Sequence, residues 1–141
     1  MMGPIQPSGL PAPAPEGGYE TSAFWTATAE QSLLVGHCGC CQQWSWPPTR
    51  SFCPHCGHRG IDLVPSSGRG GVYSYTLVHR SVGTYSDAVP YYLAYVLLDE
   101  GVTMMSNLVG VDEIEVAVNM RVRVVFEPTA SKAMLPRFRP E

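Results

Sequence analysis

Four cysteines in the first half of the chain have the types and the spacing best suited to chemistry. They form two Cys-x-x-Cys pairs, Cys38 with Cys41 and Cys53 with Cys56. Two residues between the cysteines let a tight knuckle aim both sulfurs at one ion, and two such pairs about a dozen residues apart are typical of a four-thiolate zinc site. Because four thiolates leave no open coordination position, the spacing predicts one structural Zn²⁺ per chain rather than a catalytic metal.

Two other readings of these cysteines use the same residues. Two disulfides are disfavoured, because no basic region followed by an apolar core precedes them and cytosolic chains rarely keep disulfides. Iron in a rubredoxin-like site would use the same four ligands, so the sequence leaves zinc and iron open. Gly39 and Gly57 suit the knuckles, because glycine accepts positive φ angles. Cys40, the fifth cysteine, is expected to be a reduced thiol beside the site.

The sequence contains no pattern typical of a self-contained active site. It has neither a Gly-x-Ser-x-Gly elbow nor a Walker loop. Three of its four histidines adjoin the cysteines, and only His79 stands apart from them. We therefore expect no catalysis by the chain alone, and an independent hydrolase or lyase is the least favoured class.

Composition narrows the possible partners. The chain has 141 residues, 45% of them hydrophobic, a formal net charge of −3 and nine Lys and Arg. This balance gives no basic patch for nucleic acid. The longest apolar run, Tyr91 to Leu98, is far shorter than the roughly twenty residues that span a bilayer. We expect a cytoplasmic protein that binds neither nucleic acid nor membrane.

The chain divides into four segments. Residues 1–18 are rich in Pro, Gly and Ala and predict a flexible arm. Residues 19–34 predict a helix, from Thr21 to Leu34, that carries Phe24 and Trp25. Residues 35–65 hold the two knuckles, with Trp44, Trp46 and Phe52 expected to pack around the metal as a small satellite core. Residues 66–141 alternate between apolar and polar side chains as strands do.

The last segment predicts a mainly β fold. Five strands are expected, over 72–79, 90–99, 102–109, 121–127 and 135–138, the last at an edge because of Pro136. Asp99-Glu100-Gly101 predicts a hairpin turn, and Asp112 to Val116 a short turn or helical segment. Five short strands with one brief insertion favour a small Greek-key barrel of the OB type.

The order of these parts resembles a known family. The matching residues are Phe24-Trp25, Cys38, Cys41, Pro47-Pro48, Cys53-Pro54-His55-Cys56, Gly68 to Tyr75, Val78-His79-Arg80 and Leu135 to Arg139. They resemble the zinc-ribbon/OB-fold family associated with acyl-CoA enzymes, catalogued as domain of unknown function thirty-five. The resemblance covers about 24–139 and departs from the family pattern at Gly71, an extra glycine before the strand. It implies an N-terminal helix, a rubredoxin-like zinc ribbon and an OB-fold barrel.

The resemblance also implies a function. Members of that family are usually non-catalytic subunits that pair with thiolase-superfamily proteins, including sterol-carrier-type thiolase homologues and the aldolases derived from them. The expected role is therefore that of an accessory or scaffold subunit that helps to form a CoA-thioester site. A retro-aldol step in steroid side-chain degradation is one setting that the resemblance suggests.

Three groups of residues are candidates for contacts in such a complex. Phe24 and Trp25 are expected either to pack on their own domain or to dock into the partner subunit. Four residues are expected to contact acyl-CoA. His79 and Arg80 lie at a strand end. The guanidinium of Arg137 would bind a phosphate, and the ring of Phe138 would stack on the adenine. His79 also fits a hydrogen-bonded barrel residue.

The loop from Arg80 to Pro90 is long for a hairpin connection, and long loops on small rigid scaffolds often carry function. Tyr85 within it is expected to reach the partner's active site, unless the loop is only a surface connection.

A second class of function stays open at this point. An OB barrel with tyrosines along its strands also suits a single-stranded nucleic-acid-binding protein, in which aromatic rings stack on bases. The acidic balance of the chain opposes this reading.

Overall fold

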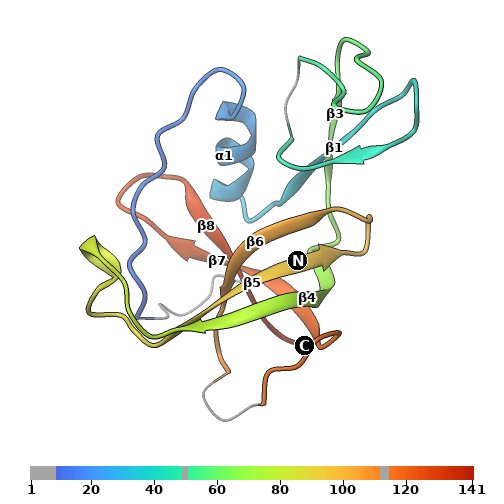
Figure 1. Ribbon diagram of the computed structural model, residues 1–141. Coiled ribbons are helices and arrows are strands. Elements are labelled where there is room, and N and C mark those ends of the chain that lie inside the picture. Colours follow the sequence, from blue (N-terminus) through green and yellow to red (C-terminus); the bar gives the residue numbers. More distant parts are fainter. Residues whose placement is uncertain (1–8, 49–50, 112–114) are drawn as a thin grey trace.

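The computed structural model describes residues 9–48, 51–111 and 115–141 (Figure 1). The described part has one α-helix, α1 (Ser22–Ala29), followed by two β structures. The first is a small sheet of β1 (Leu34–His37), β2 (Trp44–Ser45) and β3 (Asp62–Pro65). The second is a barrel of β4 (Arg69–Val78), β5 (Tyr91–Leu98), β6 (Thr103–Leu108), β7 (Arg121–Pro128) and β8 (Met134–Pro140), with a 3-10 turn η1 (Gly83–Tyr85) between β4 and β5.

The small sheet holds the two cysteine knuckles. Its order is β2-β1-β3, with both neighbours antiparallel to β1. Cys38 directly follows β1, and the second knuckle lies on the connection from β2 to β3. Figure 1 shows this ribbon standing at one corner of the molecule, beside α1 and above the barrel. The metal-binding residues therefore form a separate module rather than part of the barrel interior.

The barrel is closed and has the strand order β4-β5-β6-β8-β7, with β4 paired to both β5 and β7. Four of the pairings are antiparallel, and β6 with β8 is parallel. The five-stranded Greek-key barrel expected from the sequence is confirmed. The hairpin at Asp99-Glu100-Gly101 is also confirmed, because Leu98 and Val102 pair across it, with a distance of 2.8 Å from the Leu98 N–H to the Val102 oxygen.

One prediction about the barrel is wrong. The strand over 135–138 was expected at an edge, but β8 lies between β6 and β7. A closed barrel has no edge. Pro136 fits there because it pairs with Phe126 on β7, and the Ser106 hydroxyl of β6 donates to its carbonyl oxygen at 2.7 Å.

The helix is also shorter than predicted. It ends at Ala29 instead of running to Leu34, because Gln31 adopts a left-handed φ of 59° and turns the chain towards β1. Thr28 ties the helix to the barrel: its hydroxyl donates to the Trp25 carbonyl at 2.6 Å and accepts from the Met134 N–H of β8 at 3.1 Å. The helix therefore packs on β8 (Figure 1).

The segment before the helix, Gly9–Gly18, has no helix or strand. In Figure 1 it runs from beside the β4–β5 loop up to α1. Its Pro11 carbonyl oxygen accepts hydrogen bonds from Tyr85 and Arg137. The first eight residues of the predicted arm and part of the predicted 112–116 turn lie outside the described residues, and the predicted domain boundaries stay predictions. Among the described residues, no helix has the length and apolarity needed to cross a bilayer.

Candidate functional site

The four predicted ligands converge on one point of the ribbon. The sulfurs of Cys38, Cys41, Cys53 and Cys56 all lie within 4.8 Å of one another. Cys38 Sγ is 3.7 Å from Cys56 Sγ, and Cys41 Sγ is 3.6 Å from Cys53 Sγ. A tetrahedral ion with metal–sulfur bonds of about 2.3 Å needs sulfur–sulfur edges of about 3.8 Å. The observed distances fit one shared ion and are far too long for the disulfide alternative, which needs about 2.05 Å.

The two knuckles are built alike. Each cysteine pair closes a turn in which a backbone N–H four residues on donates to the first cysteine's carbonyl, at 2.9 Å in both knuckles. N–H groups also point at the sulfurs: the N–H of Cys41 lies 3.5 Å from Cys38 Sγ and that of His55 lies 3.3 Å from Cys53 Sγ. The positive φ falls on Gly57 in the second knuckle, as predicted, but on Gln42 rather than Gly39 in the first.

The electrostatics of the cluster favour a bound cation. Burial raises the pKa of Cys53, but the N–H groups of Cys56 and His55 outweigh it and lower the pKa of Cys53 to about 6. The N–H of His58 lowers the pKa of Cys56, yet burial and the other three sulfurs raise the pKa of Cys56 to about 12. With a pKa of about 12, Cys56 would keep its proton at neutral pH unless positive charge were added. A bound divalent metal ion supplies that charge.

The ribbon has little apolar core of its own. Its buried cluster is Cys38, Cys53 and Ile61, with Cys41 packed beside them. The predicted satellite core of Trp44, Trp46 and Phe52 is wrong. The two tryptophans pack against the barrel's hydrophobic core, whereas Phe52 is exposed. Cys40 is exposed and outside the ligand set, and no histidine joins the cluster among the described residues. The cysteines therefore form a structural metal site.

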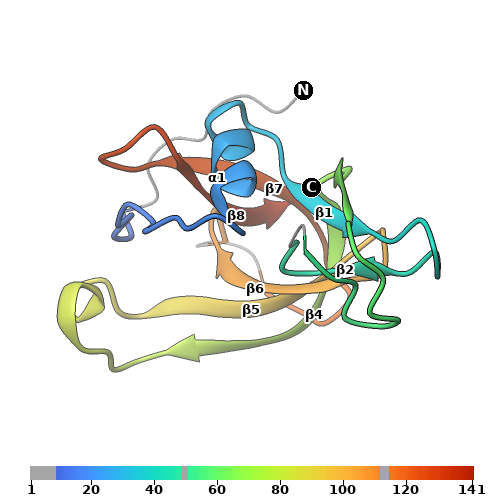
Figure 2. The ribbon, with the colours of Figure 1, turned by 90° about the horizontal axis from the view of Figure 1, so that it is seen from above.

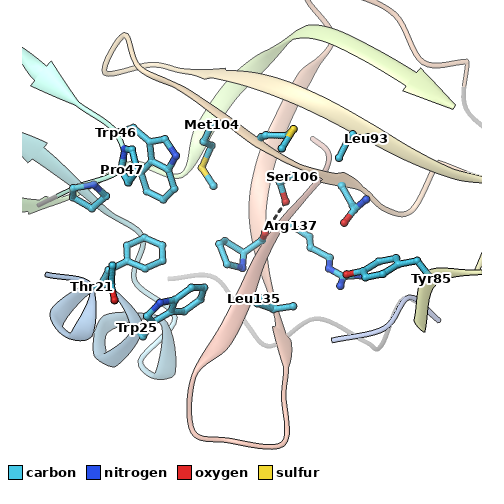
Figure 3. A pocket seen from close by; sticks show the side chains of 15 residues that line it. Thr21, Trp25, Trp46, Pro47, Tyr85, Leu93, Met104, Ser106, Leu135 and Arg137 are labelled. Atoms are coloured by element: carbon cyan, nitrogen blue, oxygen red, sulfur yellow. Dashed lines mark hydrogen bonds between the residues drawn. The ribbon is translucent and has the colours of Figure 1, made fainter. Parts of the chain in front are cut away.

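A second feature is an apolar cavity of about 380 Å³ at the junction of the modules (Figure 3). Helix α1, the Trp46–Pro48 segment, strands β6 and β8 and the β4–β5 loop all contribute to its wall. Figure 3 shows the tryptophans at one end of the cavity and Arg137 with Tyr85 at the other. Its lining includes Trp25, Trp46, Leu93, Met105, Leu135 and Pro136. Sequence reasoning missed this cavity.

The residues predicted to bind CoA do not form one site. Phe138 is fully buried in the barrel core, so its ring cannot stack on an adenine, and the predicted exposure is wrong. The Arg137 side chain is also buried, with Nη1 2.8 Å from Glu127 Oε2, so it is not a free phosphate ligand. His79 and Arg80 are exposed just beyond β4, and neither lines the cavity.

The other candidate contact residues meet at the cavity. Phe24 is buried in the chain's own core, and Trp25 is half-buried and packed against that core. Their rings make an edge contact, with centroids 4.9 Å apart. Tyr85 lies on η1 and donates from its hydroxyl to the Pro11 carbonyl at 3.2 Å. Trp25 and Tyr85 are far apart in the sequence, but both line this cavity.

Apart from Arg69, which begins β4 and pairs with Glu141, the outer face of β4, β5 and β6 carries no Asp, Glu, Lys, Arg or His. Strand pairing places Tyr95 between Ser74 and Met105, and Leu93 between Thr76 and Asn107. Tyr95, Leu97 and Met105 are 47%, 41% and 56% exposed, respectively. We call this surface the uncharged face; its residues are Ser74, Thr76, Val78, Tyr91, Leu93, Tyr95, Leu97, Thr103, Met105 and Asn107. Figure 2 shows these strands as one long twisted layer on one side of the barrel.

Comparison with known proteins adds to this geometry. Two family profiles match in tandem: the ChsH2 rubredoxin-like zinc ribbon domain over residues 25–62 and the ChsH2 C-terminal OB-fold domain over 63–127. A DUF35 domain-containing scaffold protein from Pyrococcus furiosus is 33% identical over 75% of this chain and 77% of its own length. A solved chain described as Ltp2-ChsH2(DUF35) aldolase is 31% identical, with a TM-score of 0.78, over 90% of this chain and 98% of that chain.

A further relative is longer. The probable enoyl-CoA hydratase alpha subunit of Thermomonospora curvata is 35% identical over 84% of this chain, but the matched region spans only 37% of that protein. The matches to the scaffold protein and to the solved chain cover most of this chain and most of each relative. Together with the ribbon and barrel seen here, they show that this chain belongs to the DUF35 family.

Proposed function

We propose that the chain is a non-catalytic accessory subunit of an acyl-CoA enzyme, and that the uncharged face receives the partner. That face is the single observation that carries the proposal. Protein surfaces seldom leave Tyr, Leu and Met exposed together without charged neighbours, and the centres of protein interfaces are depleted of charge and enriched in Tyr and Met.

The chemistry of the described residues supports an accessory role. Four cysteine ligands leave no coordination position for a substrate. The hydroxyl, amide and guanidinium side chains that line the cavity all bond within the fold; they are Thr21, Tyr85, Ser106, Asn107 and Arg137. The names of the relatives point the same way, because they include a scaffold protein, a hydratase alpha subunit and an aldolase complex. The ion that we propose for the four sulfurs is Zn²⁺, which would hold the ribbon and take no part in a reaction.

The partner that we propose is a thiolase-superfamily subunit, either a thiolase or a retro-aldol lyase, acting on an acyl-CoA in the cytoplasm. Steroid side-chain degradation is the setting suggested by the family resemblance. Leu93 and Met105 belong both to the uncharged face and to the wall of the cavity. Trp25 and Tyr85 line the same cavity, so they lie beside the margin of that face. A partner on this face would therefore also contact the cavity.

Co-purification tests the proposal. The chain is co-expressed with a thiolase-superfamily subunit from the same genome, as wild type and as Tyr95→Asp and Met105→Asp. Each buried aspartate would leave an unpaired charge in the interface, so the partner should no longer co-purify. Val118→Asp is the matched control, because Val118 is 54% exposed but lies outside the uncharged face. Equal recovery of the partner with all variants, at unchanged zinc content and melting temperature, would overturn the assignment of the face.

Nucleic-acid binding is not favoured by the geometry. Tyr75 and Tyr95 are exposed enough for stacking, but the face around Tyr95 offers no cation for the phosphates. A gel shift with single-stranded DNA at low salt is expected to show no complex.

A further inference from the structure

We propose that Arg137 and Tyr85 form a binding site for a neutral carbonyl group attached to an apolar moiety, and that the chain's own Pro11 occupies it. The Pro11 carbonyl oxygen accepts a hydrogen bond from Nη2 of Arg137 and another from the Tyr85 hydroxyl at 3.2 Å. Two donors from distant parts of the chain, one on β8 and one on η1, thus converge on a single acceptor. Such convergence fixes both the position and the direction of a carbonyl group.

The site is built rather than incidental. Arg137 is only 2% exposed, although a guanidinium in that position must be paired. Its partner Glu127 is equally buried, and the strand pairing of β7 with β8 sets the two side chains on one face of the barrel wall. The ion pair fixes the guanidinium so that Nη2 faces the acceptor. The site therefore does not depend on a flexible surface arginine.

The charge balance selects the kind of ligand. Glu127 already neutralises Arg137 through the 2.8 Å contact, so the pair as a whole carries no net charge. A carboxylate or phosphate at the Pro11 position would place a second anion beside one buried cation, where charges interact strongly. A neutral amide, ester or ketone oxygen accepts the same two hydrogen bonds without that penalty. The site is thus selective for a carbonyl and not for an acid.

The cavity supplies the apolar part of the site. Arg137 and Tyr85 form its polar end, and Trp25, Trp46 and Leu135 line the remainder (Figure 3). Its volume of about 380 Å³ is large enough for a compact apolar group and lies within the range of small-molecule sites. A ligand with a ring or short chain next to a neutral carbonyl would fill the cavity and displace Pro11. We call the segment Gly9–Gly18 the strap, because at Pro11 it is fastened over the polar end of the cavity.

Competition between the strap and a ligand means that ligand binding would release the strap. Tyr85 lies on the connection between β4 and β5, and its hydroxyl is directed to the strap. Once another carbonyl takes the place of Pro11, the strap is released while Tyr85 and Arg137 keep their bonds. Ligand binding at Arg137 would therefore change the mobility of residues 9–18, at the opposite end of the sequence.

Backbone mobility in the full-length chain tests whether the site holds the strap. Backbone ¹⁵N order parameters are measured by NMR at the amides of Leu10, Ala12 and Ala14 in wild type, Tyr85→Phe and Tyr91→Phe. Tyr85→Phe removes one of the two donors and should lower these order parameters from about 0.85, typical of rigid backbone, towards about 0.6, typical of a flexible segment. Tyr91→Phe is the matched control, because its ring lies 5.5 Å from that of Tyr85 but its hydroxyl donates to Ser81 instead of the strap.

Two probes test what the site selects. N-cyclohexylacetamide offers a neutral carbonyl beside an apolar ring, and cyclohexylacetate offers the same ring with a carboxylate. The amide should saturably change the fluorescence of Trp25 and Trp46 and lower the order parameters of the strap, whereas the acid should do neither at equal concentration. Equal order parameters of the strap in wild type and Tyr85→Phe, a strap that stays rigid at saturating amide, or competition by the acid as strong as by the amide would each overturn the proposal.

Discussion

The ribbon and the barrel are neighbouring modules of one chain of 141 residues, but each is stabilised by a different kind of interaction. The ribbon buries only Cys38, Cys53 and Ile61 in a cluster of its own. The barrel buries a continuous apolar core, which also takes in Val35 of β1 and in which Val96, Val122, Val124, Phe126 and Phe138 have no exposed surface. A module with so small a core depends on its ion, whereas the barrel is stable through packing. The comparison predicts that each module can be damaged while the other persists.

Breaking the metal site should have the largest effect. Structural zinc contributes about 10–16 kcal/mol of apparent binding free energy in small zinc domains, all of which is folding free energy. Cys53→Ser removes one thiolate, so elemental analysis should find a loss of the one zinc per chain, and residues 35–65 should lose protection from hydrogen exchange. The β4–β8 amides should keep theirs.

Cys40→Ser serves as the control, because Cys40 is exposed and stands outside the four converging sulfurs. It should retain one zinc. If Cys53→Ser unfolds the barrel as well, the two modules form one cooperative unit and the comparison fails.

The converse experiment damages the barrel and spares the metal. Glu127→Gln leaves the Arg137 guanidinium buried beside a neutral amide, which should lower the free energy of unfolding by about 3–5 kcal/mol. Glu141→Gln breaks the exposed pair with Arg69 and should cost less than about 1 kcal/mol. Urea unfolding measures both values, and zinc content should not change in either variant. A small loss for Glu127→Gln would mean that water reaches the pair.

A smaller loss is expected at the seam where the barrel closes. Gly70 pairs with Leu98 on one side and Val122 on the other, and a Cβ there would lie 2.3 Å from the Leu97 carbonyl oxygen. Gly70→Ala must shift backbone, at about 1–3 kcal/mol. Gly71→Ala meets nothing closer than 3.8 Å and should be tolerated, so thermal unfolding of the two variants compares the two neighbouring glycines directly.

How far the sequence could be read also differs between the modules. The four ligands were predictable because a Cys-x-x-Cys pair is a local signal whose spacing alone decides the geometry. The barrel strands followed from their period of two. The positive φ at Gln42 was not predictable, because the first knuckle repeats the turn of the second with a residue other than glycine.

The cavity and its polar end could not be predicted, for a physical reason. Their lining comes from α1, the Trp46–Pro48 segment, η1 and strands β6 and β8, which are adjacent only after folding. Arg137 was predicted to bind CoA because a guanidinium suits phosphate, and no local pattern shows that β7 brings Glu127 beside it. Both faces of β8 are covered instead: Phe138 points into the barrel, and Arg137 is enclosed by Glu127 and the strap.

Acid should separate the two modules once more, and here the barrel gives the smallest effect. The hydrogen bonds from Arg121, with both nitrogen–oxygen distances 2.9 Å, lower the pKa of Asp99 below its usual 3.8. A lowered pKa in the folded state means that the pair stabilises the barrel above pH 3.8 and that this contribution is lost as the pH falls through the folded value. The pair is about half exposed on both sides, so screening limits it to less than about 1 kcal/mol. Asp99→Asn should therefore lower stability slightly at pH 7, and this effect should shrink as the pH falls below 3.8.

The ribbon should release its ion at a higher pH than this, because protons compete with the metal for four thiolates. Zinc release followed by a chromogenic chelator, with barrel unfolding followed by circular dichroism in the same titration, measures the two steps. Coincident steps would show that the ion also holds the barrel, and an Asp99→Asn effect that grows as the pH falls below 3.8 would show that the carboxylate is not the group lost.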